Sequence, residues 1–193
     1  VPTTLLSMVD ASVGGKTGVD LGNLKNQIGV INVPQMVLID TDYLKTLPQS
    51  EMRSGLAEML KHGLIYDATY WEKFLDLKAI DFADLDELIY RSVEIKNEIV
   101  MQDPTEKHIR KALNFGHTLG HAIESYFLEN ENKKTLLHGE AIAIGMILES
   151  YISLHKNLLT KEEYSQIKST IKSIYDDVII EENDIEPILE LLI

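Results

Sequence analysis

The sequence predicts a mainly α-helical protein in which several helices follow a short segment with strand-like features. After Leu47-Pro48, apolar residues recur at the 3.6-residue spacing that is typical of helices. Before that point the apolar runs are short, and residues 10–29 are rich in Gly, Asn and Lys. The change near residue 48 therefore divides the chain into two predicted segments, 1–47 and 48–193.

The first segment contains two candidate strands. Residues 1–6 form an apolar, strand-like start, and residues 10–29 are predicted to be a loop. Residues 33–39 end in a continuous apolar run, Met36-Val37-Leu38-Ile39, which is typical of a strand buried on both faces.

The second segment is predicted to hold seven helices. Pro48-Gln49-Ser50-Glu51 is typical of a helix start, and Thr160 with Glu163 forms a capping box. Residues 141–148 are apolar on almost every side, which indicates a buried helix, and residues 130–134 indicate a surface loop. The predicted helices lie near residues 51–65, 68–77, 84–102, 105–127, 139–155, 161–176 and 184–192.

The composition excludes several classes of function. Hydrophobic content of 45% and charged content of 25% are those of an ordinary globular protein. A formal charge of −13 argues against nucleic acid and acidic membranes as partners, although a local patch can still bind a small anion. The chain has no cysteine, hence no disulfide and no thiolate ligand. It shows no membrane span and no secretory leader, so a cytoplasmic protein is expected.

Two histidines mark the first candidate site. His117 and His121 are four residues apart, so a helix places them on one face together with Glu124. The apolar stripe of the same helix lies on roughly the opposite side. These imidazoles therefore point to solvent or into a polar cleft.

Several cations and a carboxylate are further candidates. Glu58 and Lys61 are helix neighbours, and a surface ion pair is the simpler interpretation of them. Lys96 interrupts an apolar stripe, which fits equally a snorkelling side chain and an amine that binds an anion. Arg110 and Asn114 share a helix face just before the histidines, where an arginine suits phosphate or carboxylate but is more often simply exposed.

A metal site is a further hypothesis. Glu58, His117 and His138 would supply one oxygen and two nitrogens, a set that suits Zn²⁺ with an open position for substrate. No spacing rule derives this trio, because its members lie on three predicted helices. The chain lacks His-Glu-x-x-His, and Gly14-Gly15-Lys16-Thr17 lacks the first glycine of a Walker loop. It also lacks Gly-x-Gly-x-x-Gly, so it offers no complete dinucleotide loop.

Taken together, these segments resemble the 3-dehydroquinate synthase family, in family order from residue 2 to about 150. Local departures are Ala11, where a serine is usual, and the insertion at 129–135. The matching stretches are Pro2-Thr3-Thr4-Leu5-Leu6, Val9-Asp10-Ala11-Ser12-Val13-Gly14-Gly15-Lys16-Thr17-Gly18, Leu24-Lys25-Asn26-Gln27-Ile28-Gly29, Leu44-Lys45-Thr46-Leu47-Pro48, Gly55-Leu56-Ala57-Glu58 to Lys61, Glu94-Ile95-Lys96, Leu113-Asn114-Phe115-Gly116-His117 to Glu124, and His138-Gly139-Glu140-Ala141.

The resemblance implies a multi-helix domain for metal and substrate at 48–193, preceded at 1–47 by a short α/β remnant of an NAD-binding domain. The family's pyrophosphate loop would lie upstream of this chain, and a basic C-terminal segment would lie beyond Ile193. A fragment that is inactive on its own is therefore expected, from a protein that forms a homodimer at full length.

The resemblance also implies roles for single residues. The implied metal ligands are Glu58, His117 and His138, for Zn²⁺ or Co²⁺. The implied NAD contacts are Thr3, Thr4, Lys16, Lys25, Tyr43, Leu44, Lys45 and Thr46. The implied substrate contacts and catalytic residues are Asp10, Lys16, Asn26, Lys61, Lys96, Arg110, Asn114 and, for proton transfer, His121.

The implied reaction converts 3-deoxy-arabino-heptulosonate 7-phosphate, a small anionic sugar phosphate, into 3-dehydroquinate and phosphate, with catalytic NAD and a divalent metal. Three alternatives remain: a related sugar-phosphate cyclase, a metal-dependent polyol dehydrogenase, and a metal-binding helical module without activity. The cations Lys61, Lys96 and Arg110 count against the dehydrogenase, which needs no phosphate clamp.

Overall fold

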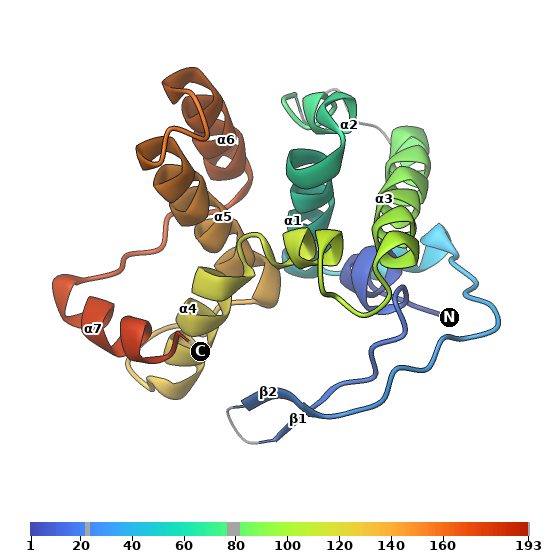
Figure 1. The fold of residues 1–193 in the computed structure, drawn as a ribbon, viewed down its shortest axis with the longest axis horizontal. Helices are drawn as coiled ribbons and strands as arrows, with labels where there is room; N and C mark the ends of the chain where they lie inside the picture. The colour runs from blue at the N-terminus through green and yellow to red at the C-terminus, as the bar shows by residue number, and fades with distance from the viewer. Residues whose placement is uncertain (22–23, 77–81, 193) are drawn as a thin grey trace. The chain divides into compact units, whose positions relative to one another are not determined.

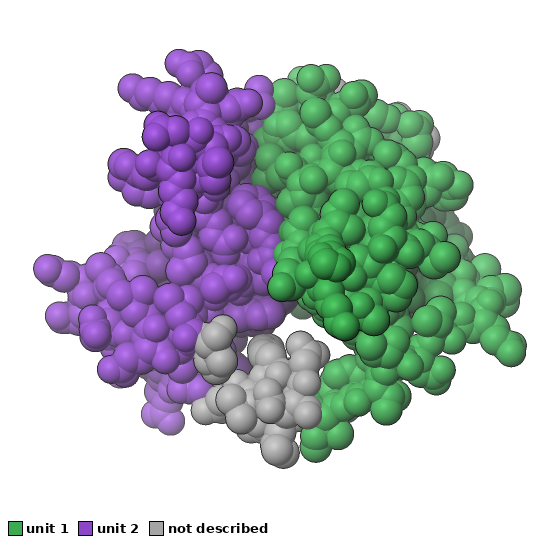
Figure 2. Space-filling model, in the orientation of Figure 1, with its two compact units in different colours: residues 1–112 green, residues 113–193 purple. Residues whose placement is uncertain are grey.

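The structure is a computed structural model that describes residues 1–21, 24–76 and 82–192. The chain forms two compact units, Val1–Ala112 (unit 1) and Leu113–Ile193 (unit 2), shown in green and purple in Figure 2. Both units consist mainly of helices, as the sequence predicts (Figure 1). Within the described ranges, no helix combines the length and the apolar character needed to cross a membrane.

Unit 1 is built on two long helices, α1 (Gln49–Tyr66) and α3 (Phe82–Gln102), which pack against each other. A five-residue π-helix, η1 (Ser7–Ala11), packs against both and buries Met8 and Val9. Gly55 of α1 permits this approach, because a Cβ there would lie 2.5 Å from the backbone nitrogen of Leu6. The remaining elements are β1 (Val19–Leu21), β2 (Leu24–Ile28), the 3₁₀ helices η2 (Thr41–Thr46) and η4 (Ile109–Asn114), and α2 (Ala68–Glu72).

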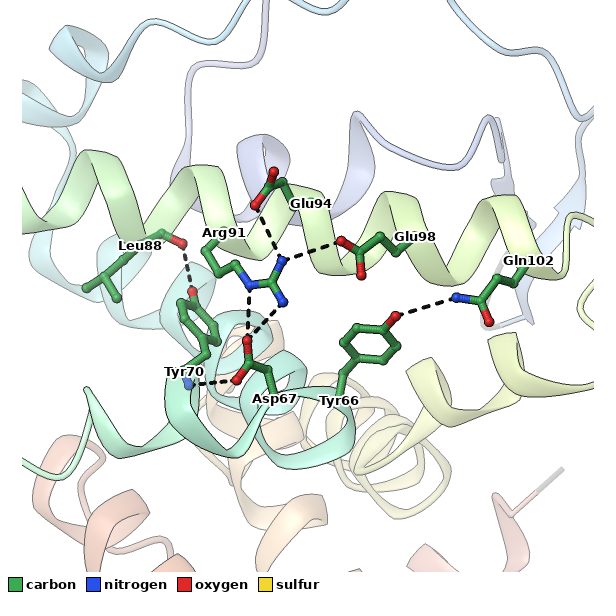
Figure 3. Close-up of polar contacts among 8 residues, drawn as sticks. All are labelled: Tyr66, Asp67, Tyr70, Leu88, Arg91, Glu94, Glu98 and Gln102. Atoms are coloured by element: carbon green, nitrogen blue, oxygen red, sulfur yellow. Dashed lines mark hydrogen bonds and ion pairs between the residues drawn. The ribbon is translucent and has the colours of Figure 1, made fainter.

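A charged cluster ties α2 to α3 (Figure 3). The guanidinium of Arg91 donates from Nε and Nη2 to one carboxylate oxygen of Asp67, at 3.0 and 2.9 Å. It also reaches Glu94 and Glu98 at 3.4 Å. Asp67 in turn caps α2 by accepting from the backbone N–H of Tyr70. Because these groups satisfy one another, the cluster serves to hold a short helix in place.

Unit 2 contains α4 (His117–Glu129), α5 (His138–His155), α6 (Lys161–Ile174) and α7 (Glu182–Glu190). Helix α5 contacts both α4 and α6, and α7 packs on α4. Residues 141–146 of α5 include the buried Ala141, Ile142, Ala143 and Met146, as predicted, whereas Leu148 is exposed. The capping box of Thr160 and Glu163 is also present at the start of α6.

The loop at 130–134 is fastened to α7. Lys133 donates to Asp184 at 2.8 Å and to Glu181 at 3.2 Å, and the Tyr126 hydroxyl donates to Asp184 at 2.6 Å. The hydrogen bond from Lys133 is the main reason why the pKa of Asp184 falls to about 2. The loop that precedes His138 is therefore held by an ion pair as well as by packing.

The predicted helix at 105–127 is wrong: it is two elements separated by a break. Residues 109–114 form η4, and α4 begins only at His117, after Gly116 with a φ of +79°. Upstream, the carboxylate of Asp103 accepts the backbone N–H groups of Lys107, His108 and Arg110, which holds the chain in a turn. The sequence pattern did not reveal these local hydrogen bonds.

The N-terminal predictions are also corrected. Leu5 and Leu6 start a helical turn that leads into η1, because Thr4 and Ser7 exchange hydrogen bonds at its beginning. Part of the predicted loop at 10–29 is the antiparallel pair β1–β2, with Val19 opposite Ile28. The predicted buried strand at 33–39 is coil with exposed Val33, Met36 and Leu38, because no strand in the described part of the chain pairs with it.

Candidate active site

Several charged side chains of unit 1 are buried, on α1, α3 and η4. Each would be costly to remove from water without a partner, so their partners define the site. Glu58, Lys61, Lys96 and Arg110 are all at most 6% exposed, and Asp103, which holds the turn after α3, is buried as well.

Glu58 and Lys61 form an ion pair one turn apart on α1. The sequence favoured a surface pair, and this is wrong: Glu58 is 0% and Lys61 1% exposed. A surface pair contributes little to stability, whereas breaking a buried pair leaves an uncompensated charge and costs several kcal/mol, about 3–5. A buried pair of this kind is a reasonable place to look for function.

Lys96 reaches from α3 to the end of η1. Its Nζ donates to the Asp10 carboxylate at 2.6 Å and also to the Asp10 backbone carbonyl. Burial lowers the pKa of Lys96, while the charge of Asp10 acts in the opposite direction. Of the two interpretations left open by the sequence, the structure favours the amine held inside over the snorkelling side chain.

Arg110 fastens the glycine-rich segment to the turn after α3. Its guanidinium donates to the carbonyls of Gly14 and Pro104, each at 3.1 Å, so an exposed arginine is not what the structure shows. A Cβ on Gly14, whose φ is +102°, would lie 2.9 Å from the same guanidinium. Lys16 forms an ion pair with Glu106 of that turn.

His62 is a candidate that the sequence analysis missed. It is 0% exposed, and its Nδ1 lies 2.7 Å from the hydroxyl of Ser92. Burial is the main cause that lowers its pKa to about 3, so the imidazole is neutral at physiological pH. Possible ligand atoms of Asp10, Glu58 and His62 lie within 4.8 Å of one another. The signal was present, since His62 follows Glu58 by four residues on α1.

Unit 2 brings three histidines together. The ring centroids of His117 and His121 are 5.1 Å apart, and that of His138 lies 5.5 and 5.7 Å from them. Their possible ligand atoms lie within 4.8 Å of one another. His117 and His138, the two predicted imidazole ligands, are therefore neighbours, and His121 accompanies them.

Oxygen acceptors orient two of these rings. The Nδ1 of His117 lies 3.2 Å from the carbonyl of Phe115, and the Nδ1 of His138 lies 3.3 Å from the Glu124 carboxylate. A carbonyl or carboxylate oxygen requires a protonated Nδ1, so in the neutral form of each ring Nε2 is the nitrogen that can bind a metal. Metal-binding histidines usually have such an acceptor, which hydrogen-bonds the ring nitrogen that does not face the metal.

The start of α4 is fixed by Glu149 of α5. Gly116 offers no side-chain cap, and the Glu149 carboxylate instead accepts the backbone N–H of Gly116 at 2.8 Å and of Leu119 at 3.4 Å. The helices approach closely at Gly145, where a Cβ would lie 1.9 Å from the Gly116 carbonyl oxygen. The position of His117 therefore depends on α5.

The remaining predicted residues are placed as follows. The hydroxyl of Thr4 forms a hydrogen bond with that of Ser7, the first residue of η1. Residues 43–46 lie in η2, where the ammonium group of Lys45 forms an ion pair with Asp42 at 2.7 Å. The backbone of Lys25 and Asn26 lies in β2, but their side chains are outside the described ones. Thr3 is exposed near the N-terminus, and Asn114 ends η4 as an exposed residue of unit 2. Glu58 belongs to unit 1, whereas His117 and His138 belong to unit 2.

Comparison with known proteins now decides the family. Residues 55–193 match the family described as 3-dehydroquinate synthase C-terminal, and residues 1–54 match the one described as 3-dehydroquinate synthase N-terminal. The chain belongs to the 3-dehydroquinate synthase family. The resemblance stated from the sequence is confirmed.

Relatives within the 3-dehydroquinate synthase family are similar over most of the chain. The 3-dehydroquinate synthase of Parabacteroides distasonis is 41% identical over all of this chain and 54% of its own length. That of Streptococcus pyogenes serotype M49 is 46% identical over 86% of this chain and 46% of its own. The chain thus spans about half the length of the curated relatives it matches.

Two solved structures share the fold. One is ValA, the 2-epi-5-epi-valiolone synthase of Streptomyces hygroscopicus subsp. jinggangensis 5008, solved with NAD⁺ and Zn²⁺ bound. It is 31% identical with a TM-score of 0.82, and the match covers 99% of this chain and 53% of the ValA chain. The other is a 2-deoxy-scyllo-inosose synthase complexed with carbaglucose-6-phosphate, NAD⁺ and Co²⁺, which is 28% identical with a TM-score of 0.80. This match covers 100% of this chain and 52% of the synthase chain.

Proposed function

We propose that this chain is the metal- and substrate-binding part of a 3-dehydroquinate synthase, a lyase of the shikimate pathway. The reaction would convert 3-deoxy-D-arabino-heptulosonate 7-phosphate into 3-dehydroquinate and phosphate. The observation that carries the proposal is the group of buried cations, Lys61, Lys96 and Arg110, in a chain of the family whose net charge is −13.

The buried cations suit an anionic substrate. Taking an ammonium or guanidinium group out of water is costly, and here each one faces a carboxylate or a carbonyl of the same unit. A phosphate or carboxylate of the substrate would exchange these internal contacts for stronger charge-assisted ones. Asp10 would accept from a substrate hydroxyl. Lys16, Asn26 and Asn114 are proposed as further substrate contacts on the strength of the family motifs.

The residues present fit a divalent metal. The Glu58 carboxylate already lies against a positive charge, that of Lys61, and the Nδ1 atoms of His117 and His138 face oxygen acceptors, which leaves Nε2 of each neutral ring for a metal. We propose these three residues, Glu58, His117 and His138, as the ligands of Zn²⁺ or Co²⁺. His121 would move a proton to or from the substrate, since its ring lies beside those of the two histidine ligands.

The chain fits NAD only in part. A dinucleotide can contact the exposed side chains of Tyr43 and Lys45 and the hydroxyls of Thr3 and Thr4. The other proposed NAD contacts are Lys16, Lys25, Leu44 and Thr46. No glycine-rich pyrophosphate loop occurs in the sequence, so the chain would supply only some of the contacts. When bound, NAD supplies a reversible hydride acceptor and the metal a Lewis acid.

The test is phosphate release from the heptulosonate phosphate in the presence of NAD and Zn²⁺ or Co²⁺. We expect release by a longer protein that contains this chain and none by the 193-residue chain alone. In the longer protein, Lys96→Met should lower kcat/KM by at least about 100-fold, a loss of the order of one buried charge-assisted contact. Lys168→Met, which removes a lysine at the surface of α6, serves as the matched control. Absence of phosphate release from the longer protein would reject the proposal.

A related sugar-phosphate cyclase is the second candidate, because both solved relatives are synthases with other names. Identities of 41% and 46% to 3-dehydroquinate synthases favour the first candidate over this one. Product analysis separates them: release of phosphate from another sugar phosphate, with the heptulosonate phosphate left unchanged, would assign the cyclase.

Location and assembly are proposed with the function. The family resemblance is what supports a cytoplasmic homodimer, and a chain without cysteine is compatible with that location. Sedimentation of the longer protein at micromolar concentration would measure the assembly.

A further inference from the structure

We propose that His62 is a positioning residue of the site and acts through Lys61: its Nε2 accepts a hydrogen bond from the Lys61 ammonium group when the Glu58 carboxylate binds the metal. The inference rests on the proposed function, because only there does Glu58 become a metal ligand. All three residues lie on α1, within unit 1. His62 is not among the residues to which the family resemblance gives a role.

His62 holds a buried ring nitrogen that lacks a hydrogen-bond partner. The residue is 0% exposed, and its Nδ1 lies 2.7 Å from the Ser92 hydroxyl, whereas Nε2 has no partner among the residues that the structure describes. A buried polar atom left in this state is costly. One nitrogen of the ring lies within 4.8 Å of carboxylate oxygens of both Asp10 and Glu58, so the imidazole adjoins the buried charges of the site.

A chain of hydroxyl groups determines which ring nitrogen carries the proton. The Tyr70 hydroxyl donates to the carbonyl of Leu88 at 2.7 Å, which leaves the Tyr70 oxygen as an acceptor. A hydrogen bond from Ser92 acts to lower the pKa of Tyr70, although burial raises that pKa overall. Because the single hydroxyl proton of Ser92 is directed at Tyr70, the Ser92 oxygen accepts from Nδ1–H of His62. Nε2 is then the nitrogen with the lone pair.

The charges around the ring suit a lone pair that faces Lys61. After burial, the ammonium group of Lys61 is the largest cause that lowers the pKa of His62. Lys96 lowers this pKa as well, whereas Glu58 and Asp10 raise it. An ammonium group stabilises the neutral imidazole, whose lone pair can accept its proton in a hydrogen bond. Lys61 is 1% exposed and therefore needs an acceptor within the protein.

Metal binding at Glu58 creates the need for this second acceptor. In the structure the ammonium group of Lys61 forms its ion pair with the Glu58 carboxylate, one turn earlier on α1. Carboxylate oxygens that are shared with a cation are weaker partners, and a buried ammonium group that loses its partner is strongly destabilising. A neutral acceptor beside the pair lets Lys61 stay in place. It adds no negative charge that would repel an anionic substrate.

The first experiment measures the tautomer of His62 by long-range ¹H–¹⁵N NMR of the 193-residue chain at pH 7. We expect a neutral imidazole with the proton on Nδ1, assigned as the ring whose signals are absent in His62→Gln. A proton on Nε2 would overturn the proposal, because Nε2 could then not accept from Lys61. This measurement does not depend on enzyme activity.

The second experiment is a double-mutant cycle on phosphate release by the longer protein with NAD and Zn²⁺. His62→Phe, which keeps a ring without nitrogen, should lower kcat/KM by at least about 10-fold, the cost of one hydrogen bond to a charged group. His62→Gln, whose amide oxygen can take the place of Nε2, should stay within about 3-fold of the parent protein. In a Lys61→Met background, His62→Phe should lower kcat/KM by no more than about 2-fold further, because its partner is already gone.

His155→Phe, the same change at an exposed histidine of α5, is the control and should match the parent protein. Equal losses from His62→Phe with and without Lys61 would overturn the proposal, because His62 would then act by another route. A His62→Phe protein with the activity of the parent would overturn it too. Neither result touches the synthase proposal, which fails only if the parent protein releases no phosphate.

Discussion

The buried histidine of unit 1 makes the stability of the protein depend on pH in a way that one substitution should abolish. His62 is buried, and this burial is the main cause that lowers its pKa from 6.5 to about 3. Between these two pH values the unfolded chain binds a proton at His62 that the folded chain does not. This stabilising contribution is therefore complete above pH 6.5, and it is lost as the pH falls toward 3.

The size of the effect follows from the shift. Each pH unit within the window removes about 1.4 kcal/mol of unfolding free energy, so the fall from pH 6.5 to 4.5 removes about 2.7 kcal/mol through His62. His62→Asn should remove this dependence, because the amide can still bond to Ser92 but does not titrate. The variant will be less stable at pH 7, and its slope against pH should be shallower by about 1.4 kcal/mol per unit.

The assay is urea unfolding followed by the fluorescence of Trp71, the single tryptophan of the chain. Trp71 is buried in unit 1 and packs against Gly63, next to His62, so it reports the relevant unit. His155→Asn, at an exposed position of α5, is the control and should keep the parent slope. Equal slopes for the parent chain and His62→Asn between pH 6.5 and 4.5 would refute the argument.

Three further substitutions test other contacts. Gly145→Ala should destabilise the protein by at least about 3 kcal/mol in thermal unfolding followed by circular dichroism, because the new Cβ would lie 1.9 Å from the Gly116 carbonyl oxygen. Asp184→Asn should lower the thermal midpoint at pH 7. Because the pKa of Asp184 is lowered from 3.8 to about 2, chiefly by its lysine partner, the contribution is present above pH 3.8, and the difference from the parent should shrink as the pH falls toward 2. Arg91→Lys should cost about 0.5 kcal/mol in urea unfolding, since the two contacts to Asp67 are partly exposed.

Each of these has a result that would contradict it. Leu148→Ala, at an exposed site of α5, is the control for Gly145→Ala, and comparable losses in both would remove the close helix contact as the cause. A constant difference in thermal midpoint from pH 7 to 2 would show that the charge of Asp184 is not what stabilises the loop. A loss above about 2 kcal/mol for Arg91→Lys would mean that the pair is far less hydrated than its exposure indicates.

The helices were predictable because each buries an apolar stripe that repeats along the sequence. Helix α5 and the capping box at Thr160 lie where the pattern places them. The predicted helix at 105–127 failed because Asp103 and Gly116 act through backbone hydrogen bonds and a left-handed dihedral angle, which leave no periodic signal. The prediction of a strand at 33–39 was wrong because a run of apolar residues does not show whether the fold supplies neighbouring strands to pair with it.

The candidate site was predictable only where a family motif named the residue. The residues alone could not tell a buried Glu58–Lys61 pair from a surface pair, because helical spacing is the same in both cases. His62 and Glu149 were missed, and the contact of Glu124 with His138 was not foreseen, because these roles come from contacts with residues 30, 33 and 14 positions away. Such contacts appear only when the helices are packed.

The dependence of α4 on Glu149 also bears on the order in which the protein folds. A helix whose first amides are satisfied by a carboxylate from another helix gains that stabilisation of its first turn only when the neighbour has docked. The imidazoles of His117 and His121 should therefore reach their final spacing only late, after the hairpin of α4 and α5 has closed. A nascent chain would then gain its affinity for transition metals as a step distinct from, and later than, its gain of helical content.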